Sequence, residues 1–258
     1  MRINPLVRET LAGITRPGRA QLDYLALLAV QALVVLMWWP KGGVAQWLES
    51  QSGPDTLSAV VMAVGVTTAY HALRAGAEEF LLPGQHGLRD WTLATPLSLG
   101  RIVRGYVLGQ FVHIVYLVTL SAPVVLTAFT VSGGEWRAVS LCMAATLVQA
   151  MFYALGGAVM QLAIGHHREE CHFFVRTVLV VVYLPVGWLA PFTSHVALTS
   201  RAIGDGAQIQ TAFSGVPEPW AFMALYVGLT MLMALAVYLL LMRSRARRAG
   251  PRSEAVMP

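Results

Sequence analysis

The sequence predicts an all-α integral membrane protein, with one domain over residues 1–258 that contains six transmembrane helices. Of its 258 residues, 56% are hydrophobic and only 12% are charged, whereas about a quarter of the residues of a soluble domain are charged. Six apolar runs have the length that a helix needs to cross a hydrocarbon core, roughly 20 residues. The runs do not alternate between apolar and polar residues as membrane β-strands do. Helices are therefore predicted for all six.

An amphipathic helix is predicted before the first run, over residues 3–16. Asn4 can cap this helix and Pro5 suits its first turn. One face is apolar and the opposite face carries charged residues, so we expect the helix to lie in the cytoplasmic interface of the membrane. A merely soluble N-terminal helix is the alternative. The apolar face consists of Ile3, Leu6, Val7, Leu11 and Ile14.

The six runs follow in order along the chain and end in a basic tail, residues 243–258. No small-residue cleavage site follows the first run, so we expect no removable signal peptide. The segment 193–219 is too apolar for a free linker, and it forms either two short helices that dip into the outer leaflet or an ordinary packed loop. The predicted spans are residues 22–39, 57–73, 106–130, 139–164, 173–192 and 220–242.

The distribution of Lys and Arg predicts the orientation of the spans. Fifteen of the 18 basic residues fall on the side of the termini, and only Lys41, Arg137 and Arg201 fall on the other. Basic loops stay in the cytoplasm, so both termini are predicted to be cytoplasmic, in the inner membrane of the cell. This asymmetry and the attraction of basic residues to membrane lipids explain the pI of about 9.6. We therefore expect no nucleic-acid partner.

The loop between the second and third spans, residues 75–105, is much longer than a simple connection needs. It opens with the acidic pair Glu78 and Glu79. Residues 88–94 can form about two helical turns, Pro96 stops them, and Ser98 can cap the third span. A loop of this kind predicts a contact surface on the cytoplasmic side.

This loop resembles the corresponding loop of the ABC-2 type permeases, the membrane subunits of type-2 ABC exporters. In that family an acidic pair leads into a short helix, then into a Thr-Pro-Leu-Ser stretch and a basic, Gly-containing start of the third span. Glu78-Glu79 and residues 88–93, 94–98 and 101–105 match this order. The N-terminal helix, the six spans and the long fifth-to-sixth segment match as well. The chain departs from the family at residues 87–91, where a Gly-Thr step is common.

The resemblance implies an ABC-2 exporter-like bundle that moves substrate by alternating access. The sequence has no Gly-x4-Gly-Lys-Ser/Thr motif, so the chain is not expected to be an enzyme or to hold a cofactor, and cytosolic ATPase subunits would bind ATP and Mg. A second permease copy or a paralogue would complete the transporter. The residues implied in ATPase coupling are Glu78, Glu79, Leu88, Arg89, Asp90, Trp91, Leu93 and Pro96.

The short helix is expected to present an apolar knob of Leu88, Trp91 and Leu93 to a groove of the ATPase, oriented by Arg89 and Asp90. The alternative is a cap on its own bundle, with Trp91 in the membrane interface.

A second cytoplasmic contact is predicted in the loop between the fourth and fifth spans, residues 166–172. Because His167 and Cys171 are four residues apart, this loop also raises the alternative of a transition-metal site. A solvated turn needs no metal, and we predict none. The residues expected to make the contact are His167, Arg168, Glu169 and Glu170.

Polar residues within the spans either line a substrate path or bridge neighbouring helices. His71 and His113 also raise a haem-binding alternative. Gly105 with Gly109, and the pair Gly156 and Gly157, predict close helix contacts within the bundle or between two copies. The competing functions are a membrane assembly or binding protein and a haem- or metal-binding membrane subunit. The candidate path residues are Gln110, His113, Gln149 and Tyr153.

Overall fold

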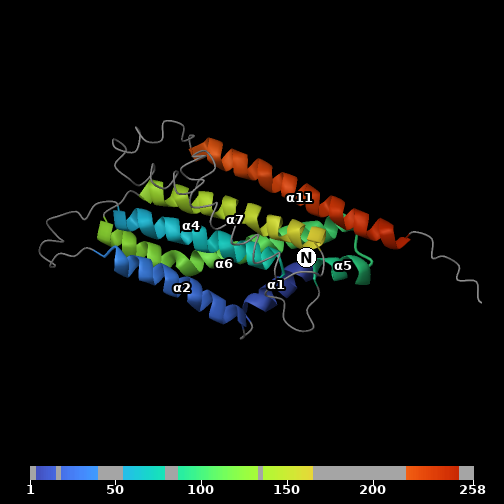
Figure 1. The fold of residues 1–258 in the computed structure, drawn as a ribbon, viewed down its shortest axis with the longest axis horizontal. Coiled ribbons are helices and arrows are strands. Elements are labelled where there is room, and N and C mark those ends of the chain that lie inside the picture. The colour runs from blue at the N-terminus through green and yellow to red at the C-terminus, as the bar shows by residue number, and fades with distance from the viewer. Residues whose placement is uncertain are drawn as a thin grey trace, which may run out of the picture.

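The computed structural model describes residues 4–15, 19–39, 55–78, 87–132, 136–164 and 219–249, and these residues form seven α-helices and no strand. The long helices run side by side along the longest dimension of the molecule, and the short helix α5 lies at one end (Figure 1). The predicted all-α fold is confirmed for these residues. The helices are α1 (Pro5–Thr15), α2 (Arg19–Met37), α4 (Asp55–Gly76), α5 (Leu88–Ala94), α6 (Leu99–Ser132), α7 (Trp136–Ile164) and α11 (Pro219–Ala249).

Four of these helices are long and apolar enough to cross a membrane, by length and composition. They contain the second, third, fourth and sixth predicted spans, and the chain is a multi-pass membrane protein. The first predicted span is helical too, but its apolar stretch, Gln21–Met37, is shorter. The predicted span 173–192 and the segment 193–219 lie outside the described residues. The four spans are Thr56–Gly76, Leu99–Ser132, Trp136–Ala163 and Trp220–Ala246.

Two helices extend beyond their predicted bounds. Helix α6 has 34 residues, a length of about 51 Å at 1.5 Å per residue, so it is longer than the hydrocarbon core. The helix begins directly after Ser98, the predicted cap, and its first seven residues precede the predicted apolar run. Helix α11 continues to Ala249, and the beginning of the predicted basic tail is therefore helical as well.

Two apolar clusters show in which direction each helix runs. The cluster at the end where α5 lies, here called the α5 end, combines Leu88 with the start of α6 and the ends of α7 and α11. The cluster at the opposite end combines the end of α2, the start of α4, the end of α6 and the start of α7. Helices α7 and α11 therefore both run toward the α5 end (Figure 1). Ile164 and Pro219 therefore lie toward opposite ends of the bundle.

Helices α4 and α7 pack closely because two glycines allow their backbones to meet. A Cβ atom on Gly157 would collide with the carbonyl oxygen of Leu73, and a Cβ atom on Gly76 would collide with that of Ala154. Gly156 has nothing within 4 Å of its Cβ position. Of the predicted glycine pair, Gly157 thus makes a contact within the bundle.

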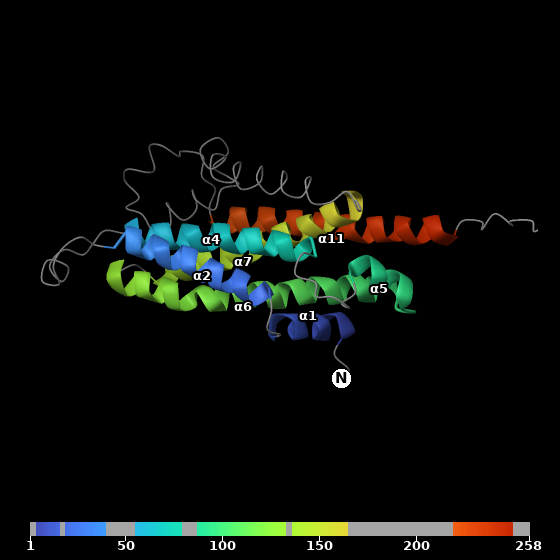
Figure 2. The same ribbon diagram turned by 60° about the horizontal axis from the view of Figure 1, so that its bottom comes forward.

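Helix α1 lies alongside the first part of α6 (Figure 2). Leu6 and Val7 are buried, whereas Leu11 is 42% exposed. Leu6 and Val7 therefore pack on protein, and the position of α1 in the membrane interface stays a prediction. Asn4 caps the helix as predicted, since its Oδ1 accepts a hydrogen bond of 3.1 Å from the Leu6 amide.

The close approach of α1 to α6 depends on Gly105 and Gly109. A Cβ atom on Gly105 would lie 2.6 Å from Cγ of Asn4, and one on Gly109 would lie 2.7 Å from Oγ1 of Thr10. Asn4 also donates a hydrogen bond of 3.1 Å to the carbonyl of Arg101 on α6. This predicted glycine pair therefore also makes its contact within one chain.

Candidate functional site

The candidate site is the short helix α5 together with three side chains that hold it, Glu78, Glu9 and Arg245, here called the α5 clamp. Glu78 lies two residues after the end of α4, Glu9 is in α1 and Arg245 is in α11. The three side chains reach α5 at its first turn, its middle and its end. The clamp thus links α5 to three other elements of the fold.

Glu78 holds the beginning of α5. Its carboxylate accepts a hydrogen bond from the Leu88 amide, one of the first amides of a helix, which lack partners within the helix. Its backbone adopts a left-handed conformation, φ 62°, which ends α4 and costs a non-glycine residue about 1 kcal/mol or more. A Cβ atom on Gly87 would lie 2.5 Å from Oε2 of Glu78, so the glycine leaves room for this carboxylate.

Asp90 completes the N-terminal cap of α5. Its Oδ2 accepts a hydrogen bond of 3.2 Å from the amide of Gly87. Carboxylates near a helix N-terminus are stabilised by the helix dipole. Glu78 and Asp90 therefore both act on the first turn, and Asp90 has a role that the sequence interpretation did not assign to it.

Trp91 joins the middle of α5 to α1. Its indole Nε1 donates a hydrogen bond of 2.8 Å to Oε2 of Glu9. The ring is partly buried and packs against the apolar cluster that contains Leu88, which is only 3% exposed. Leu88 is therefore buried in the bundle and is not presented outward, whereas Trp91 is partly exposed. Their orientation agrees with the alternative in which α5 caps its own bundle.

Arg245 holds the end of α5. Its guanidinium donates a hydrogen bond of 3.1 Å to the carbonyl of Thr92 and another of 3.1 Å to the carbonyl of Leu97. A cation is favourable at the C-terminus of a helix, where carbonyl groups lack amide partners.

The outward face of α5 is polar. Arg89, Asp90 and Pro96 are exposed, as is Ser98 at the start of α6. The surface at this end of the molecule therefore combines two charged side chains with the segment that contains Pro96.

Several predicted site residues lie outside the described part of the chain. Glu79 is among them, and the side chain of Leu93 is not described. The predicted second contact, His167, Arg168, Glu169 and Glu170, also lies outside, as does Cys171. Among the residues that the structure does describe, no group of three His, Cys, Asp or Glu side chains could hold a metal ion.

The structure gives two of the candidate path residues partners on other helices. Nε2 of His113 on α6 is 3.0 Å from the hydroxyl of Tyr24 on α2. Nε2 of Gln149 on α7 donates a hydrogen bond of 3.0 Å to the hydroxyl of Tyr226 on α11. These two residues therefore bridge helices, and Gln110 is also buried.

Sequence interpretation missed Glu9 and Arg245. Glu9 was placed on the charged face of α1 and Arg245 in a basic tail. The sequence shows that Arg245 follows a predicted span. It does not show that Arg245 binds the carbonyl of Thr92, which lies 153 positions earlier. No model of a known protein family matches the chain, and no curated protein matches it either.

Proposed function

We propose that the chain is the membrane subunit of an ABC-2 type exporter, which moves substrate by alternating access driven by a separate ATPase. The observation that carries the proposal is the α5 clamp. A short helix with a polar outward face is held by side chains from α1, α4 and α11. The resemblance of residues 78–105 to the permease family adds to this observation.

The clamp makes α5 suitable for transmitting movement. Hydrogen bonds to charged groups contribute about 1.5–3 kcal/mol each, and α5 makes such bonds to Glu78, Glu9 and Arg245. A partner that displaces α5 would lose these interactions or move the helices that provide them. Glu78 ends one membrane-spanning helix and Arg245 lies on another. Movement of α5 would thus be passed to α4 and α11, as a switch between two bundle arrangements requires.

The docking surface in this proposal is polar. Arg89 and Asp90 face outward, whereas Leu88 and Trp91 fix α5 to the bundle. The ATPase would therefore bind the charged pair and the turn that contains Pro96. The loop that contains His167 would provide a second contact, and a second copy or a paralogue would complete the transporter.

The proposed orientation puts α5 in the cytoplasm of a cell with the chain in its inner membrane. Among the described residues, Arg137 lies at the end opposite α5. Basic residues remain on the cytoplasmic side of a membrane, and a cytosolic ATPase would bind ATP and Mg on that side. The arginines toward the α5 end include Arg8, Arg74, Arg89, Arg101, Arg104, Arg243 and Arg245.

Charge reversal on the docking surface tests the proposal. The full chain is co-expressed with a candidate ATPase and purified in detergent. We expect Arg89→Glu to lower the captured ATPase by roughly tenfold, the effect of losing one charged contact. Arg137→Glu is the matched control, because it is an exposed arginine at the opposite end, and capture should stay at the level of the unmodified chain.

Failure of the intact chain to capture any ATPase would contradict the proposal and favour a membrane assembly or binding protein. A Soret band in the purified protein would instead favour the haem-binding alternative.

A further inference from the structure

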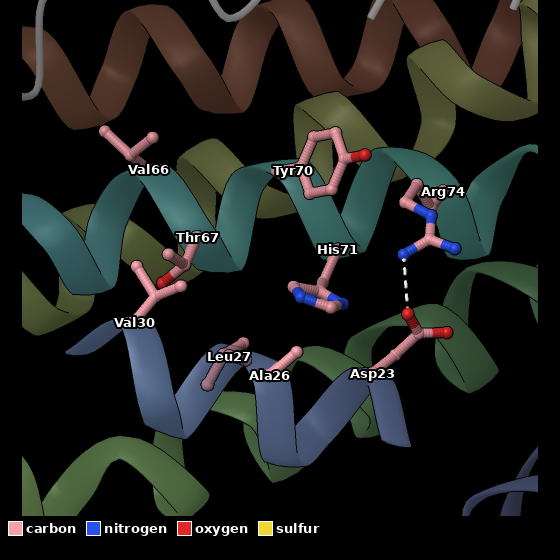
Figure 3. Close-up of a pocket in the computed structure, with 9 residues that line it drawn as sticks. All are labelled: Asp23, Ala26, Leu27, Val30, Val66, Thr67, Tyr70, His71 and Arg74. Carbon is pink, nitrogen blue, oxygen red and sulfur yellow. Dashed lines mark hydrogen bonds and ion pairs between the residues drawn. The ribbon is translucent and has the colours of Figure 1, made fainter. Parts of the chain in front are cut away.

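A cavity of about 350 Å³ lies between α2 and α4. Four of its lining residues belong to α2 and five to α4, all in the described part of the chain (Figure 3). The volume is near the lower limit for ligand sites, about 300–1,000 Å³. The lining residues are Asp23, Ala26, Leu27, Val30, Val66, Thr67, Tyr70, His71 and Arg74.

The surface of the cavity is almost wholly apolar, although two charged residues belong to its lining. Nη1 of Arg74 lies 3.0 Å from Oδ1 of Asp23, so the two charges face each other (Figure 3). Oδ2 of Asp23 is buried and is not presented to a molecule in the cavity. Apolar walls of this kind stay dry and accept apolar guests. The chemistry of the lining therefore points to a hydrocarbon.

Two contacts between α2 and α4 keep the helices apart at the cavity. The ion pair of Asp23 and Arg74 joins the helices at one end of it. At the other end, Nε2 of Gln31 donates a hydrogen bond of 2.9 Å to Oγ1 of Thr67. The two contacts are eight residues apart on α2, which is about 12 Å along the helix axis. Closing the space between them would break at least one of the two contacts.

The cavity opens toward the hydrocarbon core of the membrane. It lies between the apolar stretch Gln21–Met37 and the span Thr56–Gly76. Ala26 and Val30 belong to its lining and are exposed, Val30 by 49%. Leu33, about one turn further along α2, is 56% exposed. The molecules that surround the opening are therefore the acyl chains of lipids.

We propose that this cavity binds one acyl chain of a membrane phospholipid, which enters past Val30 and lies against Leu27 and Val66. An empty cavity would leave its lining without partner atoms, and a chain restores these contacts. The bilayer supplies acyl chains at a concentration that no dissolved apolar molecule reaches. The inference depends on the membrane fold and needs no ATPase, so it goes beyond the proposed function and fails or holds apart from it.

Photolabelling of the full chain tests the inference. The purified protein is placed in bilayers of phosphatidylcholine that carries a diazirine in the middle of one acyl chain, and the adducts are mapped by mass spectrometry. Labelling of Tyr70 is measured relative to Met231, which is 67% exposed on α11 and reports on the surrounding lipid. We expect a Tyr70 ratio well above that of Leu117, which is fully buried. A ratio as low as that of Leu117 would show that the cavity is closed to lipid or covered by a second copy, and would overturn the inference.

Two variants fill the cavity from opposite walls. Ala26→Phe fills it from α2 and Val66→Phe fills it from α4, and neither replaces a residue of the two contacts that join the helices. In both, the Tyr70 ratio should fall by roughly tenfold, because a chain beside the introduced ring meets overpacking worth at least one tenfold step in affinity. Leu25→Phe is the matched control. It introduces the same ring on α2 at a position that is 62% exposed and outside the lining, and the ratio should not change.

Thermal unfolding in detergent checks that each variant is folded. An undiminished Tyr70 ratio in both filling variants would place the labelled chain elsewhere and overturn the inference. Phosphatidylethanolamine or phosphatidylglycerol with the same labelled chain should give the same ratio as phosphatidylcholine, because the chain occupies the cavity and the headgroup stays outside. A strong preference for one headgroup would show a headgroup site instead and would also overturn the inference.

Discussion

The hydrogen bond between Trp91 and Glu9 ties the clamp to the N-terminal helix. The donor is a partly buried indole and the acceptor is a carboxylate 2.8 Å away. Charge-assisted bonds of this kind are about twice as strong as neutral ones. The pair therefore fixes the rotation of α5 around its own axis and keeps Arg89 directed outward.

Replacing Trp91 by Phe tests this contact at the residue scale. Phe retains an aromatic ring but cannot donate to Glu9, so we expect the free energy of unfolding to fall by about 1–3 kcal/mol. Thermal unfolding in detergent measures the effect. Trp220→Phe is the control, since Trp220 is 73% exposed, and a comparable loss of stability there would show that the Glu9 contact is not the cause.

Contacts close in the sequence could be predicted, and distant ones could not. The cap at Asn4 follows from the residue types before a helix, and its partner Leu6 is two positions away. Trp91 and Glu9 are 82 positions apart. Spacing along a single sequence carries no information about such a pair, so the contact of Trp91 with α1 could not be predicted.

At the scale of elements, the contact between α4 and α7 depends on one of two adjacent glycines. Gly157 faces the backbone of α4, whereas Gly156 faces open space. The two residues share a helix and a sequence context, so they form a natural matched pair. The length of the apolar runs predicted both helices, but the sequence alone left open which partner each glycine meets.

Alanine at these two positions should have opposite effects. Gly157→Ala places a Cβ atom against the Leu73 carbonyl, and the overpacking should cost about 1–3 kcal/mol. Gly156→Ala should stabilise α7 by up to about 1 kcal/mol, because alanine favours a helix interior over glycine. Unfolding of both variants in the same detergent measures the difference. Equal stability of the two would mean that α4 and α7 do not meet at Gly157.

Element boundaries were predicted less well than element identities. Helix α6 begins at Leu99, directly after the cap predicted at Ser98 but seven residues before the apolar run, and α11 continues to Ala249. Both extensions carry arginines, which do not belong in a hydrocarbon core but are good helix formers. Hydropathy therefore located the part of each helix that lies in lipid and missed the part that extends into water.

At the scale of the whole molecule, the direction of the helices and the distribution of charge agree. Helices α2 and α6 run away from the α5 end, and α4, α7 and α11 run toward it. The basic residues concentrate at the end that the sequence predicts to be cytoplasmic, and Arg137 lies at the other. The orientation could be predicted without a structure, because it depends only on which loops lie on the same side of the membrane and on how many basic residues they carry.

This agreement makes a topology prediction that thiol labelling can test. The background is a chain with Cys142→Ala and Cys171→Ala, into which Arg89→Cys or Arg137→Cys is introduced. Both introduced thiols replace exposed side chains, at opposite ends of the bundle. We expect a membrane-impermeant maleimide to label the cysteine at position 137 in intact cells, and the cysteine at position 89 only after permeabilisation, because positive charges are retained in the cytoplasm. Labelling at position 89 in intact cells would put α5 outside, out of reach of any cytosolic ATPase.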